Sequence, residues 1–434
     1  MVYIKKRMEV RKLRLTFQYV LKPNKRQQEM IDELIWHSSK VYNMLNYEVK
    51  EGKERINPKG NLNIEGSKIY KKYRKENWHS EYLHSHTLQE VILNYIGDYK
   101  SYVALEEKYK AGDKEIKGKP RMPRYKKEEK MKVTFTKYGI RREGRKIKLS
   151  ISKKMQEKFQ VKSLNFLIPK KLEKLVNLES IKMIKIGKEK RGRYKVEIIY
   201  EREEKKKAKG NNIMAIDLGM NNLASCTNMK NNKSLIIAGE SIKAKIGYLN
   251  KEIERLQGIQ MKMVGNKNYR STKRIERIYE QRRNYSNTYM HKASRMVVEY
   301  AKENECSTIV IGDIKNIKQN MKKNKKFVTI PLQKLVRKIE YKAKLEGIEV
   351  VYITEEYTSG ISSIDKEEIK KENYNKKRRI TRGLFQTNKG KIINADINGS
   401  INILRKYIKK EFSPNLEIAM DIGREQRPIK KRVA

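Results

Sequence analysis

The stretch NIMAIDLGMNNLASCTNMKNNKSLIIAG, residues 212–239, decides the fold that we predict for this chain. It begins with an apolar run that ends at Asp217 and a glycine, a pattern typical of a buried strand followed by a tight turn. The segments ASCTN and SLIIAG then flank Asn231-Asn232, and this arrangement predicts a hairpin. We therefore expect three antiparallel strands over this stretch.

The residues that follow alternate between helical and strand patterns. We expect a charged helical segment over about 243–304, a buried strand over 307–313, a helix over 331–346, a strand over 348–356 and a helix over 394–408. Three antiparallel strands followed by alternating helices and strands are the element order of an RNase H-like sheet. Short connections and right-handed crossovers predict the spatial strand order 3-2-1-4-5.

The part of the chain before residue 204 has a different pattern. An alternating strand over 11–22 ends at a Pro-Asn pair, and helical spacing then covers about 25–110. A basic loop punctuated by glycine and proline covers 107–133, and short strand-like segments occupy about 131–200. Several short strands with turns between them predict a small barrel or sandwich, whose sheet can include the strand at 11–22.

The chain is strongly basic, with 103 Lys+Arg against 51 Asp+Glu and a formal net charge of +52. Hydrophobic residues are 38% of the chain, so composition excludes a disordered polycation. Each neutralised phosphate releases counterions, so an extended polyanion is the expected partner. A membrane is the rival polyanion, but no apolar run approaches the roughly 20 residues of a spanning helix. The N-terminus lacks the apolar stretch of a signal peptide, so we expect a nucleic-acid-binding protein in the cytoplasm.

Two aspartates lie where an open α/β sheet carries its active site. Asp217 is near the carboxyl end of the first strand of this region, and Asp396 begins the last helix behind Asn394. Two or three carboxylates there can hold two Mg²⁺ ions about 3.5–4 Å apart. A single aspartate is more often a turn residue or a helix N-cap, but the pair at these positions favours a metal site. Cys226 and Cys306 form no C-x-x-C pair, so we expect neither a disulfide framework nor a zinc ribbon.

Several motifs at these positions resemble a known family. AIDLGMNNLAS (215–225), YTSGIS (357–362) and NADINGSINILRK (394–406) are similar to the RuvC segments of TnpB, the transposon-encoded OrfB protein, which is related to compact type V CRISPR effectors. KVYNMLN (40–46) and GKPRMPRYKK (118–127) agree with its N-terminal part, so the resemblance covers nearly the whole chain. It implies a transposon-associated, RNA-guided DNA endonuclease that cleaves target DNA by Mg²⁺-dependent phosphodiester hydrolysis at one RuvC site.

The resemblance also implies a multi-domain α/β and β architecture. Its parts are a β-barrel wedge domain (1–24 and 126–204), a helical recognition lobe with its basic loop (25–125), a linker (205–212), a RuvC nuclease domain of the RNase H-like fold (213–409, with 360–392 as a basic insertion) and a basic tail (410–434). From the residues themselves, we expect 360–392 to be irregular and the tail to be loose. The implied partners are a guide RNA from the transposon end and double-stranded target DNA, whose sequence is read by guide pairing. The sequence indicates no oligomeric state.

The third carboxylate is the first departure from the family. Its usual glutamate falls at Gly312, and the adjacent Asp313 is expected to point away from the first aspartate because strand side chains alternate. Some relatives carry a displaced glutamate just before YTS, where this chain has Glu355 and Glu356. We favour Glu355 as the third catalytic and metal-binding residue beside Asp217, with Asp396 as the second. Glu356 and Asp313 are the alternatives, and both glutamates can equally be exposed charges at a strand end.

The second departure is the absence of the zinc ribbon that many relatives have. KKRRITRGLFQTNKGK (376–391) fills its place, matching a cysteine-free variant of the family, so no structural zinc is expected. This loop, with Phe385, can contact phosphates or stack on a base. The candidate nucleic-acid-binding residues are Tyr42, Asn43, Asn46, Tyr47, Lys119, Arg121, Arg124, Lys126, Arg282, Arg283, Arg378, Arg379 and Arg382.

Three alternatives remain open at this point. Gly312 motivates a second hypothesis, a nuclease-dead relative that uses its RNA to occupy DNA as a repressor. A strand-transferring transposase is a weaker hypothesis, because the chain shows no H-x-H motif with a downstream tyrosine arranged for that chemistry. In WHSEYLHSH (78–86), the three histidines are expected to form a helix-turn contact surface more readily than a metal site.

Overall fold

The computed structural model describes residues 12–113, 115–175, 180–189, 192–206, 208, 210–231, 233–265, 271–313, 330–381, 383–412 and 427–433. They form two compact units, one over Lys12–Arg202 and one that includes the chain from Glu203 onward. Within these ranges, none of the helices combines the length and apolar character that crossing a bilayer requires.

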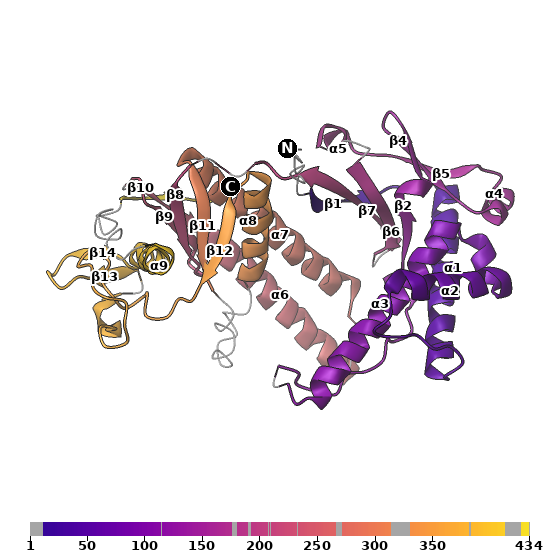
Figure 1. Ribbon diagram of the computed structural model, residues 1–434, viewed down its shortest axis with the longest axis horizontal. Coiled ribbons are helices and arrows are strands. Elements are labelled where there is room, and N and C mark those ends of the chain that lie inside the picture. The colour runs from indigo at the N-terminus through magenta and orange to yellow at the C-terminus, as the bar shows by residue number, and fades with distance from the viewer. Residues whose placement is uncertain are drawn as a thin grey trace, which may run out of the picture. The chain divides into compact units, whose positions relative to one another are not determined.

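The unit over Lys12–Arg202 combines long helices with two small sheets (Figure 1). Its helices are α1 (Lys25–Lys50), α2 (Leu62–Glu76), η1 (Trp78–Tyr82), α3 (Ser85–Lys110), η2 (Glu128–Lys130), η3 (Lys137–Gly139), α4 (Lys153–Phe159) and α5 (Lys170–Leu175). One sheet has the order β1-β7-β6-β2, with bounds Lys12–Leu21, Tyr194–Glu203, Ile181–Lys188 and Lys132–Thr136. The other has the order β3-β4-β5, with bounds Ile140–Glu143, Lys146–Ser150 and Ser163–Leu167.

The predicted membership of the first strand agrees with the structure, because β1 pairs with β7 in the four-stranded sheet. The predicted helical insertion corresponds to α1, α2 and α3, and the strand-rich segment to β2 through β7. In the described residues these strands pair into two separate sheets rather than one closed barrel. The assignments to a wedge domain and a recognition lobe stay predictions.

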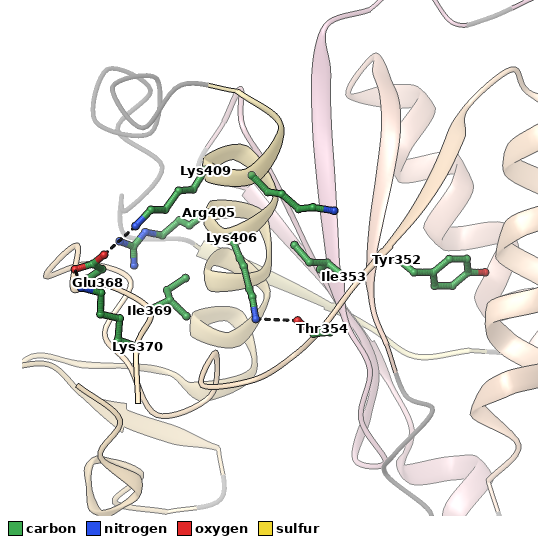
Figure 2. Close-up of a pocket in the computed structure, with 10 residues that line it drawn as sticks. Tyr352, Ile353, Thr354, Glu368, Ile369, Lys370, Arg405, Lys406 and Lys409 are labelled. Carbon is green, nitrogen blue, oxygen red and sulfur yellow. Dashed lines mark hydrogen bonds and ion pairs between the residues drawn. The ribbon is translucent and has the colours of Figure 1, made fainter. Parts of the chain in front are cut away.

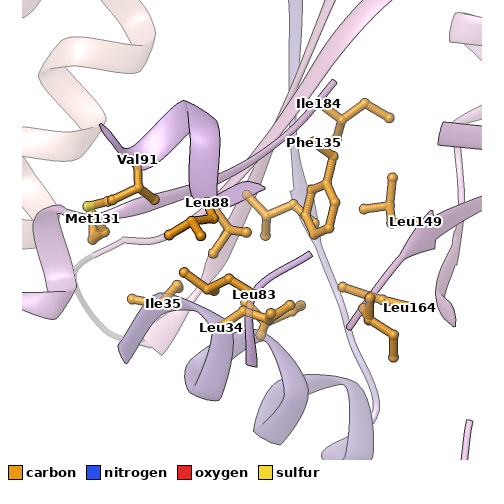
Figure 3. Close-up of a cluster of buried hydrophobic side chains, with 14 of the residues drawn as sticks. Leu34, Ile35, Leu83, Leu88, Val91, Met131, Phe135, Leu149, Leu164 and Ile184 are labelled. Carbon is orange, nitrogen blue, oxygen red and sulfur yellow. The ribbon is translucent and has the colours of Figure 1, made fainter. Parts of the chain in front are cut away.

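One hydrophobic core joins the helices of this unit to both sheets. Helix α1 begins with a capping box, in which the side chains of Asn24 and Gln27 each accept a hydrogen bond from the other's backbone N–H. This cap defines the residue at which the helix starts. Figure 3 shows Leu34 of α1 and Leu88 of α3 packed in the same cluster as Phe135 of β2. Each such side chain contributes roughly 1.5–3 kcal/mol when fully buried. The insertion is therefore part of the same folded body as the strands that flank it.

The second unit is built on one six-stranded sheet with the order β12-β11-β8-β9-β10-β15 (Figure 1). The strands are β8 (Asn212–Asp217), β9 (Asn222–Asn228), β10 (Lys233–Ala238), β11 (Cys306–Gly312), β12 (Glu349–Ile353) and β15 (Arg427–Lys431). Strand β8 pairs antiparallel with β9 and parallel with β11. The run from β10 to β12 agrees with the predicted order 3-2-1-4-5. The predicted hairpin is present as β9 and β10, although Asn232 lies outside the described residues.

Helices cover both faces of this sheet. They are α6 (Glu240–Val264), α7 (Lys273–Glu303), α8 (Leu332–Leu345) and α9 (Ala395–Glu411). Met214 and Ile216 of β8 pack in one cluster with α7 and α8, whereas Ile213 and Ala215 pack in another with α9. Because side chains alternate along a strand, Asp217 continues the series that faces α9. The sheet thus presents its first predicted catalytic residue to the helix that carries the second.

Two segments of this unit differ from the sequence interpretation. The tail was expected to be loose, but β15 pairs in parallel with β10 and extends the sheet by one edge strand. Its sequence RPIKK has a single apolar residue, so the backbone pairing that forms it has almost no side-chain signal. The insertion 360–392 was expected to be irregular, but it contains η7 (Lys376–Arg378) and a short hairpin of β13 (Leu384–Gln386) and β14 (Ile392–Asn394).

Candidate active site

Asp217 ends strand β8 directly beneath helix α9. A Cβ atom added at Gly399 of α9 would lie 2.5 Å from Oδ2 of Asp217, closer than real Cβ contacts come. Glycine at this position therefore allows the helix to pass over the carboxylate without displacing it. The amide N–H of Leu218 also acts on the Asp217 carboxylate and favours its charged form.

Asp396 is held at the first turn of α9 by the cap of that helix. The Asn394 side chain accepts hydrogen bonds from the backbone N–H groups of Asp396 and Ile397, both at 3.1 Å. The Asp396 carboxylate accepts a 2.7 Å bond from Nδ2 of Asn222 at the start of β9 and a 3.0 Å bond from Nη2 of Arg379. A carboxylate in the first turn is also favoured by the helix dipole.

Glu355 follows β12 and reaches into the space above the end of β11. A Cβ atom at Gly312 would lie 2.5 Å from Cγ and 2.6 Å from Cδ of Glu355, and nearer still to its Oε1. In the sequence analysis Gly312 was the residue that put the third carboxylate in doubt. In the structure, its missing side chain is what leaves room for Glu355.

Electrostatic coupling joins the three carboxylates. Burial, followed by the negative charges of Glu355 and Asp396, raises the pKa of Asp217 well above its usual value, while Arg379 opposes the shift. Burial, with Asp313 as a smaller cause, raises the pKa of Glu355 to about 7. Mutual repulsion of this kind is typical of functional sites that receive a positive charge.

The donor set at this site fits a hard divalent cation. In the described part of the chain, no three His, Cys, Asp or Glu side chains already converge on one metal position. The buried Oε1 of Glu355, however, has no hydrogen-bond partner in the structure. Carboxylate and amide oxygens are the ligands that Mg²⁺ prefers, and an orphaned buried carboxylate oxygen is costly unless a cation or donor meets it.

The two alternative carboxylates are placed differently from Glu355. Glu356 is exposed, and its carboxylate interacts electrostatically with Lys406. Nζ of Lys406 also donates a hydrogen bond to the backbone carbonyl of Glu356. Asp313 follows Gly312 in β11, and its N–H donates to the Ile353 carbonyl at 2.7 Å. Alternation along β11 turns Asp313 toward the face opposite α9. Of these three residues, Glu355 is the one whose charge raises the pKa of Asp217, and its role as the third carboxylate stays a prediction.

A cavity of about 580 Å³ lies beside the strand end that precedes Glu355 (Figure 2). Its walls come from α9, the end of β12 and the segment Glu368–Lys370. Lys406 of α9 donates to Oγ1 of Thr354 at 3.0 Å, and Lys409 pairs with Glu368 at 2.9 Å. The bond between Lys406 and Thr354 connects the loop that carries Glu355 to the helix that carries Asp396. It therefore helps to fix the position of one carboxylate relative to the other.

Arg379, in the basic insertion 360–392, contacts one of the candidate catalytic carboxylates. Arg379 was proposed as a nucleic-acid contact, and the structure places it between Asp396 and Asp217. Sequence reasoning missed Asn222 as a partner of Asp396; its place just after the first-strand turn, in AIDLGMNN, was the available signal. Arg378 is partly buried, and ion pairs with Glu367 and Asp365 occupy its guanidinium.

Phe385 does not stack on a base in this structure, because its side chain is fully buried beneath the Arg378 guanidinium. Arg382 lies outside the described residues. Arg282 donates to Asn250 and lies over the Tyr279 ring, whereas Arg283 is exposed. These contacts make Arg283 the more accessible cation of that pair.

The candidate patch on α1 is mostly core. Tyr42 and Asn46 are 1% and 0% exposed, and the Tyr42 hydroxyl donates to Asp98 at 2.7 Å. Asn43 exchanges two hydrogen bonds with the backbone of Lys126. The expectation of a shared contact surface is wrong for the buried residues, because positions four apart on α1 fall on its apolar face. Tyr47 remains exposed.

The basic loop after α3 presents its cations to solvent. Lys119, Arg121 and Arg124 are exposed. Lys126 differs, since its Nζ pairs with Asp98 at 2.7 Å and lies 3.9 Å from the centre of the Tyr42 ring. Three of the four candidate cations of this loop are therefore exposed to solvent, whereas Lys126 is held in an ion pair.

Comparisons with known proteins match both parts of the site. The family model OrfB_IS605, a probable transposase, matches residues 194–318, which include Asp217. The model of the Cas12f1-like TNB domain matches residues 333–403, which include Glu355, Arg379 and Asp396. The TnpB-like protein ORF457 of Acidianus two-tailed virus is 28% identical over 209 residues. That match covers 46% of this chain and 43% of the viral protein, less than half the length of the relative.

A cryo-EM structure of a Cas12f1–sgRNA–target DNA complex has a similar fold, with a TM-score of 0.57 at 15% identity. The alignment covers 87% of this chain and 82% of that one. Fold and site together define a mixed α/β, multi-domain chain of the architecture found in Cas12 effectors. In sequence, the chain is similar to the OrfB_IS605 family over 194–318, to the Cas12f1-like TNB domain over 333–403 and, over less than half of its length, to a TnpB-like viral protein.

Proposed function

We propose that this protein is a transposon-associated, RNA-guided DNA endonuclease that hydrolyses phosphodiester bonds at a RuvC-type site. Asp217, Glu355 and Asp396 form that site. The observation that carries the proposal is that the charges of Glu355, after β12, and Asp396, on α9, both act on the buried Asp217 of β8, while Oε1 of Glu355 is left unpartnered in the space above Gly312. Although the chain has a net charge of +52, the negative charges at this centre repel one another, and a bound cation would relieve that repulsion.

Mg²⁺ is the cofactor that these residues fit, and the three carboxylates would hold it. Bound Mg²⁺ would supply Lewis-acid activation of water and charge neutralisation at the phosphodiester. The chain's own groups orient the ligands. Asn222 and Arg379 fix both oxygens of Asp396, and Gly399 fixes the approach of α9 to Asp217.

Arg379 has a second part in this proposal. Its guanidinium already reduces the repulsion felt by Asp217, and it lies in the insertion rather than in the sheet. A planar cation that pairs with Asp396 and acts on Asp217 is suited to orient the non-bridging oxygens of a phosphodiester.

The proposed partners are a guide RNA from the transposon end and double-stranded target DNA. Support comes from the net charge of +52 and from the similarity of fold to a Cas12f1 solved with sgRNA and target DNA. In such systems guide pairing reads the target sequence while the protein holds the backbone.

The nuclease-dead hypothesis gains no support from the geometry. It required that no acidic side chain beyond Asp217 and Asp396 be within reach of both. Glu355 is close enough to Asp217 to raise its pKa, and the charge of Asp396 raises that pKa as well, so a third acidic side chain lies near Asp217. The Glu355 side chain occupies the space that Gly312 leaves, and this supports a displaced glutamate in place of the usual one.

The decisive experiment is Asp217→Ala in a plasmid-cleavage assay with copurified RNA. We expect cleavage to fall to background while RNA binding is retained, and unchanged cleavage would refute the assignment. A second measurement does not depend on cleavage: millimolar Mg²⁺ alone should raise the melting temperature of the wild type more than that of Asp217→Ala. Sequencing of the copurified RNA tests the guide, since random cellular RNA would exclude a guided nuclease.

A further inference from the structure

Helices α7 and α8 lie side by side on the face of the sheet opposite α9 (Figure 1). Basic side chains recur on their facing surfaces at intervals of four residues, which places each series on one side of its helix. We call this set the α7–α8 basic cluster: His291 and Arg295 on α7, and Lys334, Lys338 and Lys342 on α8.

The contacts of the cluster's lysines are to neutral groups, since burial and then the charge of Lys338 lower the pKa of His291 to about 4. Nζ of Lys338 lies 2.7 Å from Nε2 of His291. Nζ of Lys342 donates to Oγ of Ser294 at 2.7 Å and to the backbone carbonyl of His291. No cluster member forms an ion pair with a carboxylate within the described residues; Glu299 acts on Lys342 only as a weaker, more distant charge.

Neighbouring lysines on the same helices show what the cluster lacks. Lys344 of α8 pairs with Glu340 at 2.9 Å, and Lys302 of α7 pairs with Glu346 at 3.1 Å. In the cluster, burial and then the charges of Arg295 and Lys338 lower the pKa of Lys342 to about 8. Burial and then Lys334 lower the pKa of Lys338 as well. The folded protein thus gathers positive charges that repel one another without supplying an anion.

Like charges four residues apart destabilise a helix, and partial burial increases the cost. An arrangement of this kind is stable when an anion from outside completes it. The ligand must present several negative oxygens along a line, because the cluster extends over two turns of α8. A phosphodiester backbone has that form, and ammonium and guanidinium groups bind its oxygens with charge-assisted hydrogen bonds.

We infer that the α7–α8 basic cluster binds the phosphodiester backbone of a nucleic acid at a site separate from the carboxylates. The site lies on the opposite face of the sheet from Asp217 and Asp396, so it holds a part of the nucleic acid that is not being cut. This inference rests on the nucleic-acid partner proposed above, but not on cleavage.

The test is a double substitution, Lys338→Gln with Lys342→Gln, in the full-length protein. Binding of labelled single-stranded RNA and of labelled duplex DNA is followed by fluorescence anisotropy in EDTA across a salt series. Each lost phosphate contact should reduce the slope of log K against log salt by about 0.9 for duplex DNA or about 0.7 for a single strand. We expect the double variant to lose about two contacts with at least one of these ligands.

The matched control is Lys302→Gln with Lys344→Gln, which removes the same number of charges, one from α7 and one from α8, at lysines that are paired with glutamates. Its slope should equal that of the wild type, and the melting temperature of the cluster variant should be no lower than that of the wild type. The ligand whose slope falls identifies the source of the backbone, RNA or DNA. The inference would be overturned if the slope of log K against log salt fell equally in the control, or if the cluster variant kept the wild-type slope for both ligands. Either result would leave the proposed function standing. A wild type that binds neither ligand would also defeat the proposed function.

Discussion

The carboxylate site and the histidine pair of the first unit both bury titratable side chains, yet they differ in how their polar atoms are paired. Nδ1 of His37 lies 3.0 Å from Nδ1 of His79, and Nε2 of His37 lies 3.3 Å from Glu33. Tyr82 stacks on the His37 ring, and Trp78 stacks on His79. At the carboxylate site, by contrast, Glu355 has a buried oxygen with no partner in the structure.

The difference teaches that burial and a shifted pKa do not by themselves mark a functional site. The histidine pair supplies its own donors, acceptors and aromatic cover, so its shifted pKa values are a consequence of packing. The carboxylates bring like charges together and leave part of the hydrogen-bonding capacity unused, which is typical of a site that awaits a ligand. The expected contact surface at 78–86 is wrong for His79, which is 6% exposed.

The largest effect expected is the loss of cleavage in Glu355→Gln, with Glu356→Gln as the matched control. The first substitution removes a charge from the convergent site, and the second removes one from an exposed strand end. Metal stabilisation of several kcal/mol corresponds to about 10²- to 10³-fold in rate, and we expect a loss of at least that size for Glu355→Gln alone. Single-turnover cleavage measures it; equal losses in both variants would remove the distinction between the two glutamates.

A smaller but more specific effect is expected for Gly312→Ala. The added methyl group cannot coexist with the present position of the Glu355 side chain, but that side chain can swing away at little cost in stability. We expect about a hundredfold slower cleavage, as for other misplacements of a reacting group by about 1 Å. The melting temperature should stay nearly constant.

Gly383→Ala is the matched control for this substitution, because open space surrounds Gly383. Gly383 lies in the same unit, so its alanine variant tests for a general effect of adding a methyl group there. Full activity in Gly312→Ala would show that the carboxylate of Glu355 is not held by the space above β11.

The pH dependence of stability should have opposite signs in the two regions of the metal-free protein. The folded pKa of Glu355, about 7, is above the ordinary 4.5, so its cost is full above pH 7 and is relieved as the pH falls toward 4.5. The folded pKa of His37, lowered to about 4 by burial and by His79, is below the ordinary 6.5. Its stabilisation is therefore present above pH 6.5 and lost as the pH falls toward 4.

Thermal unfolding of Glu355→Gln and His37→Phe in EDTA at pH 7.5 and 5 checks these signs. At pH 7.5 the first variant should be more stable than the wild type and the second less stable, each by at most about 3 kcal/mol. Both differences should shrink at pH 5. A difference for Glu355→Gln that grows on acidification would contradict the assigned direction of its pKa.

The sequence predicted the sheet well because its strands are long apolar runs with glycine turns. It placed Asp217 at the end of a strand and Asp396 at the start of a helix, and the structure has both residues there, while their catalytic role stays a prediction. Glu355 was harder, because its position depends on the space above Gly312, a contact between residues 43 apart. The pairing of β15 was missed, since an edge strand held by backbone bonds needs no apolar pattern. The burial of Tyr42 and Phe385 was missed because aromatic side chains serve cores and nucleic acids alike.

The smallest effect expected separates two tyrosines of α1 that sequence reasoning treated alike. Tyr42→Phe removes the hydroxyl that donates to Asp98 and leaves the ring buried, so it should cost about 1 kcal/mol of stability. Tyr47→Phe is the matched change at an exposed ring and should leave stability unchanged. Chemical unfolding measures both.

Neither hydroxyl change alters net charge at neutral pH, so an effect of Tyr47→Phe on DNA binding without one on stability would indicate contact with the target. If Tyr42→Phe instead weakened DNA binding at constant stability, the buried hydroxyl would have to be reached by the ligand, against the placement found here.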